Sequence, residues 1–165
     1  MTDWHPAYIG IGSNLNDPAE QVRTAFAALD NLPDSRLIAR SHLYSNPPMG
    51  PQDQPDYVNA VAGLITRLKP AELLDAMKAI EQQQGRERKP GDRWGARIID
   101  LDLLVYGSAS VAEPGLTVPH PGIFERNFVL FPLLDIAPQL IVPGQGAVSV
   151  LIRAVQDQAI SRMEG

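Results

Sequence analysis

The chain has no cysteine, and no apolar run in its 165 residues approaches the roughly 20 residues that a membrane-spanning helix needs. The absence of cysteine excludes disulfides and thiolate metal sites. The sequence also lacks the basic stretch followed by an apolar stretch that marks a secretory signal peptide. We therefore expect a cytoplasmic protein that associates with no membrane.

Positive charge is scarce and concentrated in one segment. The net charge is −5, but residues 86–97 contain five cations and two anions, which leaves nine cations and 17 anions in the rest of the chain. This distribution favours a local anionic ligand over a nucleic acid, because nucleic-acid binders present a broad basic face. The length, with 44% apolar and 20% charged residues, predicts a single globular domain over residues 1–165.

The predicted elements follow the order β-α-β-β-α-β. Alternating apolar residues predict strands, and apolar residues three and four apart predict helices that end at proline or glycine. Strands are expected at residues 7–12, 35–46, 57–66 and 98–106, and helices at residues 18–32, with Asp17 as the N-cap, and 70–84. This order is typical of a split βαβ, ferredoxin-like fold of the α+β class with a mainly antiparallel sheet, in which the fourth strand would pair with the first in the sheet centre. Beyond it we expect an extended segment at 116–120, a helix ending near 135, a short edge strand at 138–143 and a last helix at 148–158.

Two glycines close the first predicted strand. Gly10 and Gly12 resemble the beginning of a dinucleotide-binding fingerprint, but Leu15 occupies the place of the third glycine, so the motif fails. Glycine inside a strand also marks a place where another backbone or a ligand approaches closely. We favour that interpretation.

Two aspartates in the fourth predicted strand form the main chemical signal. Side chains alternate along a strand, so Asp100 and Asp102 face the same side. Two neighbouring carboxylates repel each other unless a cation lies between them, and Mg²⁺ uses one or two carboxylates together with substrate phosphates. Upstream lie five cations of the kind that hold polyphosphate, namely Arg86, Arg88, Lys89, Arg93 and Arg97. The combination favours phosphoryl transfer, whereas the aspartates alone could equally be solvated residues on an exposed sheet face.

A proline-rich segment precedes the third predicted strand. Residues 46–55 contain four prolines and one glycine, so they form neither a helix nor a central strand. Such a segment is either a stiff spacer or a preshaped binding loop. Tyr57 and Asn59 follow it and share one face of the strand. Tyr57 by itself is more typical of a half-buried strand aromatic than of a stacking surface.

Five segments together resemble the hydroxymethyldihydropterin pyrophosphokinase family of the folate pathway. They occur in the same order as in that family and extend over about residues 7–143, nearly the whole chain. The segments are Gly12-Ser-Asn-Leu15, Pro47-Pro-x-Gly-Pro-Gln-Asp-Gln-Pro-Asp-Tyr-x-Asn59, Gly85-Arg-x-Arg-Lys89, Arg93-Trp-Gly-Ala-Arg-Ile-Ile-Asp-Leu-Asp-Leu-Leu104 and Leu116-Thr-Val-Pro-His120. The resemblance implies a ferredoxin-like domain with three α/β/α layers. It also implies an enzyme that moves the terminal diphosphate of ATP to the hydroxymethyl group of 6-hydroxymethyl-7,8-dihydropterin and leaves AMP.

The resemblance further implies roles for individual residues. Asp100 and Asp102 would hold two Mg²⁺ ions and would act in catalysis together with Arg86 and Arg97. The implied ATP-binding residues are Lys78, Arg86, Arg88, Lys89, Trp94, Arg97, Leu103, Thr117, His120, Pro121 and Arg126. The implied pterin-binding residues are Asn46, Pro47, Met49, Tyr57, Asn59, Trp94, Asp100 and Phe128, with the Tyr57 and Phe128 rings on the two faces of the pterin. The implied partners are these two small-molecule substrates, bound by a monomer without nucleic acid.

The chain departs from the family pattern at three places. Lys78 replaces a common glutamine near the nucleotide, Pro121 replaces a common tyrosine beside the histidine, and residues 89–93 include one extra residue. These differences concern the ATP contacts and leave the aspartates and the pterin positions intact. Two alternatives stay open from the residues alone: a non-enzymatic RNA-binding module and another phosphoryl transferase on the same scaffold.

Overall fold

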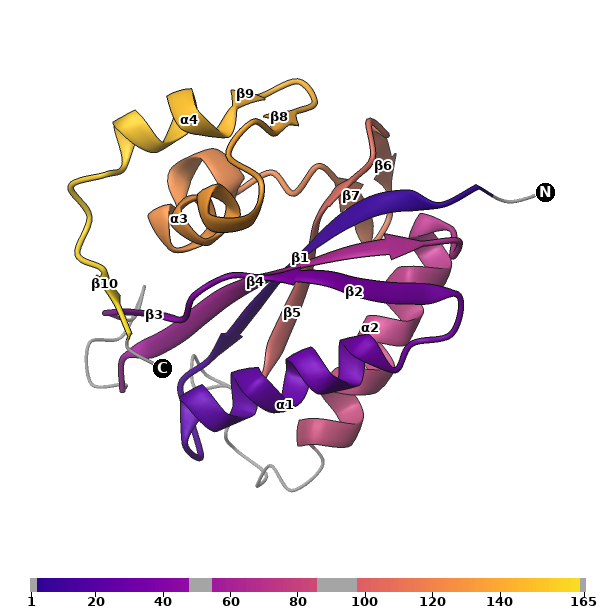
Figure 1. The fold of residues 1–165 in the computed structure, drawn as a ribbon, viewed down its shortest axis with the longest axis horizontal. Coiled ribbons are helices and arrows are strands. Elements are labelled where there is room, and N and C mark those ends of the chain that lie inside the picture. The colour runs from indigo at the N-terminus through magenta and orange to yellow at the C-terminus, as the bar shows by residue number, and fades with distance from the viewer. Residues whose placement is uncertain (1–2, 48–54, 86–97, 164–165) are drawn as a thin grey trace.

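The computed structural model describes residues 3–47, 55–85 and 98–163 and is drawn in Figure 1. Its main sheet contains β1 (His5–Ser13), β2 (Ser35–Arg40), β3 (Tyr44–Asn46), β4 (Tyr57–Thr66), β5 (Asp100–Tyr106) and β10 (Ser161–Arg162). The strand order is β10-β3-β4-β1-β5, with β2 also paired to β4, and all these pairings are antiparallel. The predicted α+β, ferredoxin-like fold with a mainly antiparallel sheet is confirmed.

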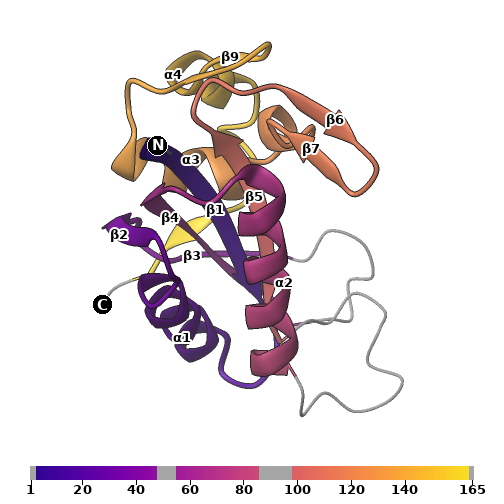
Figure 2. The same cartoon turned by 90° about the vertical axis from the view of Figure 1, so that its right-hand side faces the viewer.

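Helices cover both faces of this sheet (Figure 1 and Figure 2). The helices α1 (Pro18–Asp30) and α2 (Pro70–Gly85) lie on one face, while α3 (Asn127–Ile136) and the short α4 (Val148–Leu151) lie on the other. Each face has its own apolar core, one built with α1 and α2 and the other with α3 and α4. The protein therefore has the three α/β/α layers that the resemblance implied.

Alternation along β1 separates the first core from the opposite face. Ile9 and Ile11 are buried in the core under α1 and α2, whereas Gly10 and Gly12 face the α3 side. Fully burying an isoleucine contributes roughly 1.5–3 kcal/mol. If the pairing register of β1 shifted by one residue, its apolar side chains would move to the opposite face of the sheet. Burial of Ile9 and Ile11 therefore fixes the register of β1, and with it the residues that face α3.

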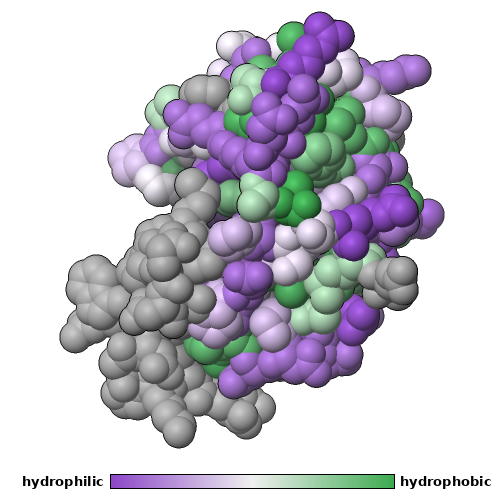
Figure 3. All heavy atoms as spheres, turned by 90° about the vertical axis from the view of Figure 1, so that its left-hand side faces the viewer, coloured by the Kyte–Doolittle hydropathy of each residue, from purple (hydrophilic) through white to green (hydrophobic). Residues whose placement is uncertain are grey.

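Two hairpins and two 3-10 helices complete the described chain. The strands β6 (Val111–Glu113) and β7 (Leu116–Val118) form one hairpin, β8 (Ile141–Val142) and β9 (Gly146–Ala147) form the other, and the 3-10 helices are η1 (Ile123–Glu125) and η2 (Ile152–Ala154). Among the described residues, no helix combines the length and the apolar character that crossing a membrane requires. Hydrophilic residues cover much of the side on which α4 and β10 lie (Figure 3).

The predicted strand at residues 35–46 is in fact two strands, β2 and β3, which both pair with β4. Between them, Ser41 Oγ accepts the Val61 N–H at 2.8 Å, and the Ser41 N–H donates to the Val61 carbonyl at 3.0 Å. A side-chain hydroxyl has thus replaced a strand carbonyl as the acceptor, so the regular pairing stops at this point. The ladder resumes where β3 pairs with the first residues of β4.

Three further predictions are wrong in detail. β5 pairs with β1 as expected, but it forms the edge of the sheet rather than its centre, because β4 occupies the other side of β1. Residues 138–143 contribute to the β8–β9 hairpin instead of an edge strand, since Gly144 and Gly146 adopt positive φ values of 73° and 120° that close a tight turn. The last helix ends at Leu151, because the chain continues through η2 and returns to β3 as β10. Asp17 is the N-cap residue of α1 as predicted, although it has a φ of 61° and makes no side-chain capping hydrogen bond.

Candidate active site

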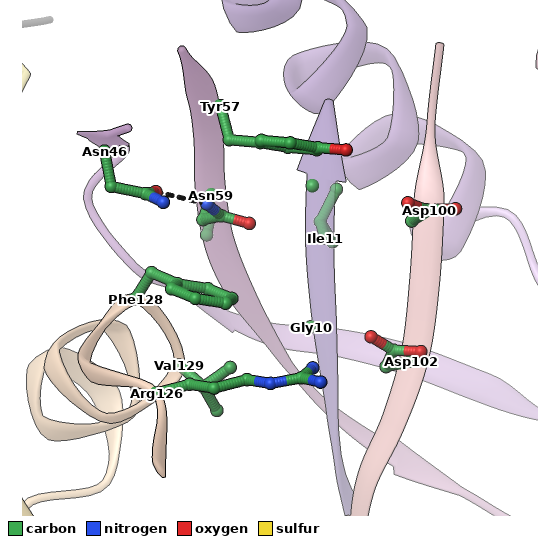
Figure 4. Close-up of a pocket in the computed structure, with 12 residues that line it drawn as sticks. Gly10, Ile11, Asn46, Tyr57, Asn59, Asp100, Asp102, Arg126, Phe128 and Val129 are labelled. Carbon is green, nitrogen blue, oxygen red and sulfur yellow. Dashed lines mark hydrogen bonds between the residues drawn. The ribbon is translucent and has the colours of Figure 1, made fainter. Parts of the chain in front are cut away.

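A pocket on the α3 side of the sheet collects most of the predicted site residues that the structure describes (Figure 4). It has a volume of about 200 Å³ and lies between four strands, β1, β3, β4 and β5, and the start of α3. Its lining residues are Gly10, Ile11, Gly12, Asn46, Tyr57, Asn59, Ala60, Asp100, Asp102, Arg126, Phe128 and Val129. Segments that are far apart in the sequence therefore meet in one pocket.

Antiparallel pairing between β1 and β5 places the two aspartates beside the two glycines. Asp100 lies opposite Gly12, and Asp102 lies opposite Gly10. Both carboxylates point toward the pocket (Figure 4). β1 therefore adds no side chain beside either carboxylate, and the interpretation that a ligand approaches the strand here stays a prediction.

The aspartate pair fits a divalent cation that is shared with a phosphate. Within the described residues, no three His, Asp or Glu side chains gather as a metal site. Mg²⁺ needs fewer protein ligands, because it usually takes one or two carboxylates together with substrate phosphates and water. Glu81 of α2 accepts the Leu101 N–H at 2.9 Å, which satisfies a donor on this edge strand and fixes the backbone between the two aspartates.

Two asparagine side chains form another wall of the pocket. Asn59 is 8% exposed, and its Nδ2 donates to Asn46 Oδ1 (Figure 4). Asn59 Oδ1 accepts no hydrogen bond from the described residues, and it lies 2.7 Å from the place that a Cβ on residue 12 would occupy. Gly12 therefore gives this oxygen its room, and the oxygen is left as an acceptor for a ligand.

Two aromatic rings enter the pocket from different elements. Tyr57 begins β4, and Phe128 lies in the first turn of α3. Figure 4 shows the two rings on either side of the Asn59 amide. The approach to β4 is fixed by the buried Asn14, whose Nδ2 donates to the Pro55 carbonyl at 3.3 Å. Flat rings on two sides of one slot suit a planar heterocycle.

Arg126 adds positive charge to this pocket. Its guanidinium lies 5.8 Å from the centre of the Phe128 ring and extends across the pocket toward Asp102 (Figure 4). Gly122 makes this position possible, because a Cβ there would lie 3.0 Å from Arg126 Cζ. The resemblance groups Arg126 with the nucleotide, whereas the structure places it in the pocket with the pterin candidates. No sequence pattern marks Gly122 as part of the site.

A second hollow of about 300 Å³ shares Asp102 with the first pocket. Its lining residues are Leu74, Leu101, Asp102, Leu103, Gly115, Leu116, Thr117, His120 and Pro121. Four of them, Leu103, Thr117, His120 and Pro121, are predicted nucleotide residues, so the structure brings these four together. Leu74 follows the apolar spacing of α2, which predicts a core residue. The sequence therefore gives no sign that Leu74 lines this hollow.

His120 is held firmly beside this hollow. Its Nδ1 accepts the Gly122 N–H at 3.0 Å, and its carbonyl accepts a hydrogen bond from Gln145 Nε2 at 3.1 Å. An accepting Nδ1 leaves the proton of the neutral ring on Nε2. Burial lowers the pKa of His120 below its ordinary 6.5, the charge of Asp102 opposes this shift, and Arg126 reinforces it. We therefore expect a neutral imidazole at pH 7 with one N–H to donate.

Residues 8–138 match a family model described as 7,8-dihydro-6-hydroxymethylpterin-pyrophosphokinase (HPPK). This chain belongs to the HPPK family. The matched range contains every residue named above as lining either hollow.

HPPK relatives are similar over nearly their whole length. A 2-amino-4-hydroxy-6-hydroxymethyldihydropteridine pyrophosphokinase from Haemophilus influenzae is 43% identical over 157 residues, which make up 95% of this chain and 97% of the relative. A protein of the same name from Pseudomonas aeruginosa is 46% identical over 158 residues, or 96% of each chain. A crystal structure of Plasmodium falciparum HPPK-DHPS has a TM-score of 0.72 at 14% identity, covering 93% of this chain and 46% of the Plasmodium chain. That likeness concerns the fold, and this chain spans less than half of the Plasmodium chain.

The remaining HPPK site predictions lie away from the two hollows or outside the described residues. Lys78 is exposed on α2 and lines neither hollow. Pro47 lines a third hollow, which also borders Phe128. The predicted residues outside the described ranges are Met49, Arg86, Arg88, Lys89, Trp94 and Arg97.

Proposed function

We propose that this HPPK family member transfers the terminal diphosphate of ATP to the hydroxymethyl group of 6-hydroxymethyl-7,8-dihydropterin, giving AMP and the pterin diphosphate for folate biosynthesis. One observation carries the proposal: a single pocket joins a flat aromatic slot, an asparagine pair and two aligned carboxylates (Figure 4). The names of the similar full-length relatives support the same reaction.

The aromatic slot suits the pterin ring. Tyr57 and Phe128 would stack on the two faces of the bicycle, and Asn59 Oδ1 would accept a hydrogen bond from one of its N–H groups. The aspartates line the same pocket, so a pterin in the slot has its reacting substituent within the same enclosure. A phosphoryl transferase for a non-planar acceptor would have no use for this arrangement, which argues against the general-kinase alternative.

Asp100 and Asp102 are the residues that would hold the metal, and we propose two Mg²⁺ ions. When bound, Mg²⁺ neutralises the charge of the phosphates and aligns them for in-line transfer. The two carboxylates offer only acceptor oxygens, and both project from one face of β5. The pairing of β5 with β1 holds their spacing before any ligand binds, so little reorganisation is needed at the moment of reaction.

The second hollow is the place that we propose for ATP. Because it shares Asp102 with the first pocket, a nucleotide there and a pterin in the slot would meet at this carboxylate. The apolar side chains of Leu74 and Leu103 would cover a flat base. The neutral His120 can donate a hydrogen bond to a phosphate oxygen, and Arg126 would stabilise negative charge that develops on the transferred group.

Release of AMP tests this proposal. We expect the purified protein with ATP, Mg²⁺ and the hydroxymethyl dihydropterin to form AMP and pterin diphosphate in equal amounts. Asp100→Ala and Asp102→Ala should each abolish turnover and leave the circular dichroism spectrum intact, since both residues line an open pocket. Asp75→Ala is the matched control, because Asp75 is an exposed carboxylate on α2 and lines neither hollow.

Two results would contradict the proposal in different ways. ATP cleavage that is indifferent to the pterin would refute the substrate assignment. A normal rate in Asp100→Ala or Asp102→Ala would refute the metal assignment.

A further inference from the structure

A short C-terminal segment connects the two sides of the pterin slot. We call residues 158–163 the C-terminal arm. It follows η2, contacts the start of α3 and then pairs with β3 through Ser161 and Arg162 (Figure 1). The Met163 N–H donates to the Leu43 carbonyl at 2.8 Å and extends this attachment. The arm lies outside the range that matches the HPPK family model.

Gln158 of the arm holds the segment that carries two pocket residues. Its Oε1 accepts the Asn127 N–H at 3.3 Å, and its carbonyl accepts a hydrogen bond from Asn127 Nδ2 at 2.9 Å. Its Nε2 donates to the Glu125 carbonyl at 3.2 Å. Asn127 is 1% exposed and lies between Arg126 and Phe128, which both line the pocket. The N-cap residue of α3 makes no side-chain capping bond, so Gln158 satisfies one of the N–H groups that the first turn leaves unpaired.

The arm also contacts the other side of the slot, through β3. β3 is only three residues long and ends at Asn46, whose Oδ1 receives the hydrogen bond from Asn59. It pairs with β4 on one side and with β10 of the arm on the other. A small hollow of about 250 Å³ lies between the arm and the slot, lined in part by Asn46, Phe128 and Gln158.

We propose that Gln158 is a positioning residue for pterin recognition, which acts by holding Asn127 and thereby Phe128 in place. This inference rests on the proposed function, because that function assigns the pterin to the slot. Without the Gln158 side chain, the Asn127 N–H at the start of α3 and the Glu125 carbonyl of η1 each lose a hydrogen bond, and the slot is less preorganised. Among the described residues, none that lines the second hollow belongs to the arm, so nucleotide binding should be unaffected.

Gln158→Ala tests this inference, with Gln156→Ala as the matched control. Both glutamines are exposed, so neither replacement opens a core. Gln156 makes no side-chain hydrogen bond within the described part of the chain. We expect Gln158→Ala to raise the Kd and KM for the pterin about tenfold and to change kcat less than about twofold. The Kd of a non-hydrolysable ATP analogue should stay the same, and Gln156→Ala should match the wild type in every measurement.

Gln158→Glu supplies the conservative variant. It keeps an acceptor for the Asn127 N–H, with a negative charge that suits the N-terminus of α3, but it loses the donor to the Glu125 carbonyl, so part of the pterin affinity should return. A purely structural role predicts something else: Gln158→Ala would lower the melting temperature, and kcat would fall with the active fraction while KM for the pterin stayed the same. That outcome, or equal pterin affinity in Gln158→Ala and Gln156→Ala, would overturn the inference and leave the proposed function standing. A wild-type protein that neither binds the pterin nor releases AMP would overturn both.

Discussion

Gly12→Ala should weaken pterin binding, whereas Gly10→Ala, two residues earlier on the same face of β1, should not. A Cβ at position 12 would lie 2.7 Å from Asn59 Oδ1, while ordinary contact begins at 3.4 Å, so this oxygen would have to retreat by about 0.7 Å. A Cβ at position 10 would lie 3.4 Å from Leu104 Cδ2, which is an ordinary contact. The two variants therefore add the same methyl group to the same strand, and they differ in whether it meets the Asn59 amide.

The magnitude follows from how firmly Asn59 is held. The residue is 8% exposed, and its Nδ2 is bonded to Asn46 Oδ1, so the amide cannot retreat without weakening that bond. One such hydrogen bond contributes about 0.5–1.5 kcal/mol, which bounds the loss of stability in the free protein. In the complex, the displaced oxygen would also lose its bond to the pterin. The loss of that bond, about 0.5–1.5 kcal/mol, corresponds to binding that is about 2- to 13-fold weaker.

Fluorescence titration with hydroxymethylpterin, in the presence of Mg²⁺ and a non-hydrolysable ATP analogue, measures this effect. The double variant Gly12→Ala/Asn59→Ala should bind no worse than Asn59→Ala alone, because the added methyl group then has no amide to displace. Equal pterin affinity in the Gly12→Ala and Gly10→Ala proteins would refute the reasoning, as would additive losses in the double variant.

Three further predictions concern catalysis, alkaline pH and the core. Arg97 lies outside the described residues. Arg97→Ala should lower kcat/KM by an amount equivalent to a loss of on the order of 2–4 kcal/mol of transition-state stabilisation, as expected for a donor directed at transition-state charge. An unchanged kcat/KM would mean that this arginine lies at the rim of the site and does not contact the reacting groups. Burial raises the pKa of Tyr44 above its ordinary 10.0, and the hydrogen bond to Asp135 and the charge of that carboxylate raise it further. The unfolded chain therefore loses this proton first, so the contribution of Tyr44 to stability is complete below pH 10.0 and declines as the pH rises above it. Urea unfolding at about pH 9 and about pH 11 should show a smaller decline in Tyr44→Phe than in the wild type, and an equal decline would contradict the assignment. Leu29→Ala empties a fully buried position of α1 and should lower the free energy of unfolding by about 2–5 kcal/mol in urea, whereas a loss below about 1 kcal/mol would mean that this core is loosely packed.

Sequence patterns alone predict the local elements and the position of the two aspartates on one face of a strand. Helix and strand periods depend on backbone geometry alone, so the apolar spacing of α1 and the alternation around Asp100 and Asp102 predict their orientation directly. Local patterns failed where a side chain or a glycine changed the course of the backbone. Ser41 divides one predicted strand into two, because its hydroxyl takes a backbone donor that a strand carbonyl would otherwise accept.

Which residues share a wall of the site depends on how the elements pack in three dimensions. Tyr57 and Phe128 face one slot because the layers pack α3 against the sheet, and nothing in the spacing of these two residues in the sequence predicts it. The same packing turns Arg126 toward Asp102 instead of placing it in the second hollow. Gln158 reaches Asn127 across 31 positions of the chain. Contacts of this kind depend on how distant segments come together in space, and therefore leave no periodic signal in the sequence.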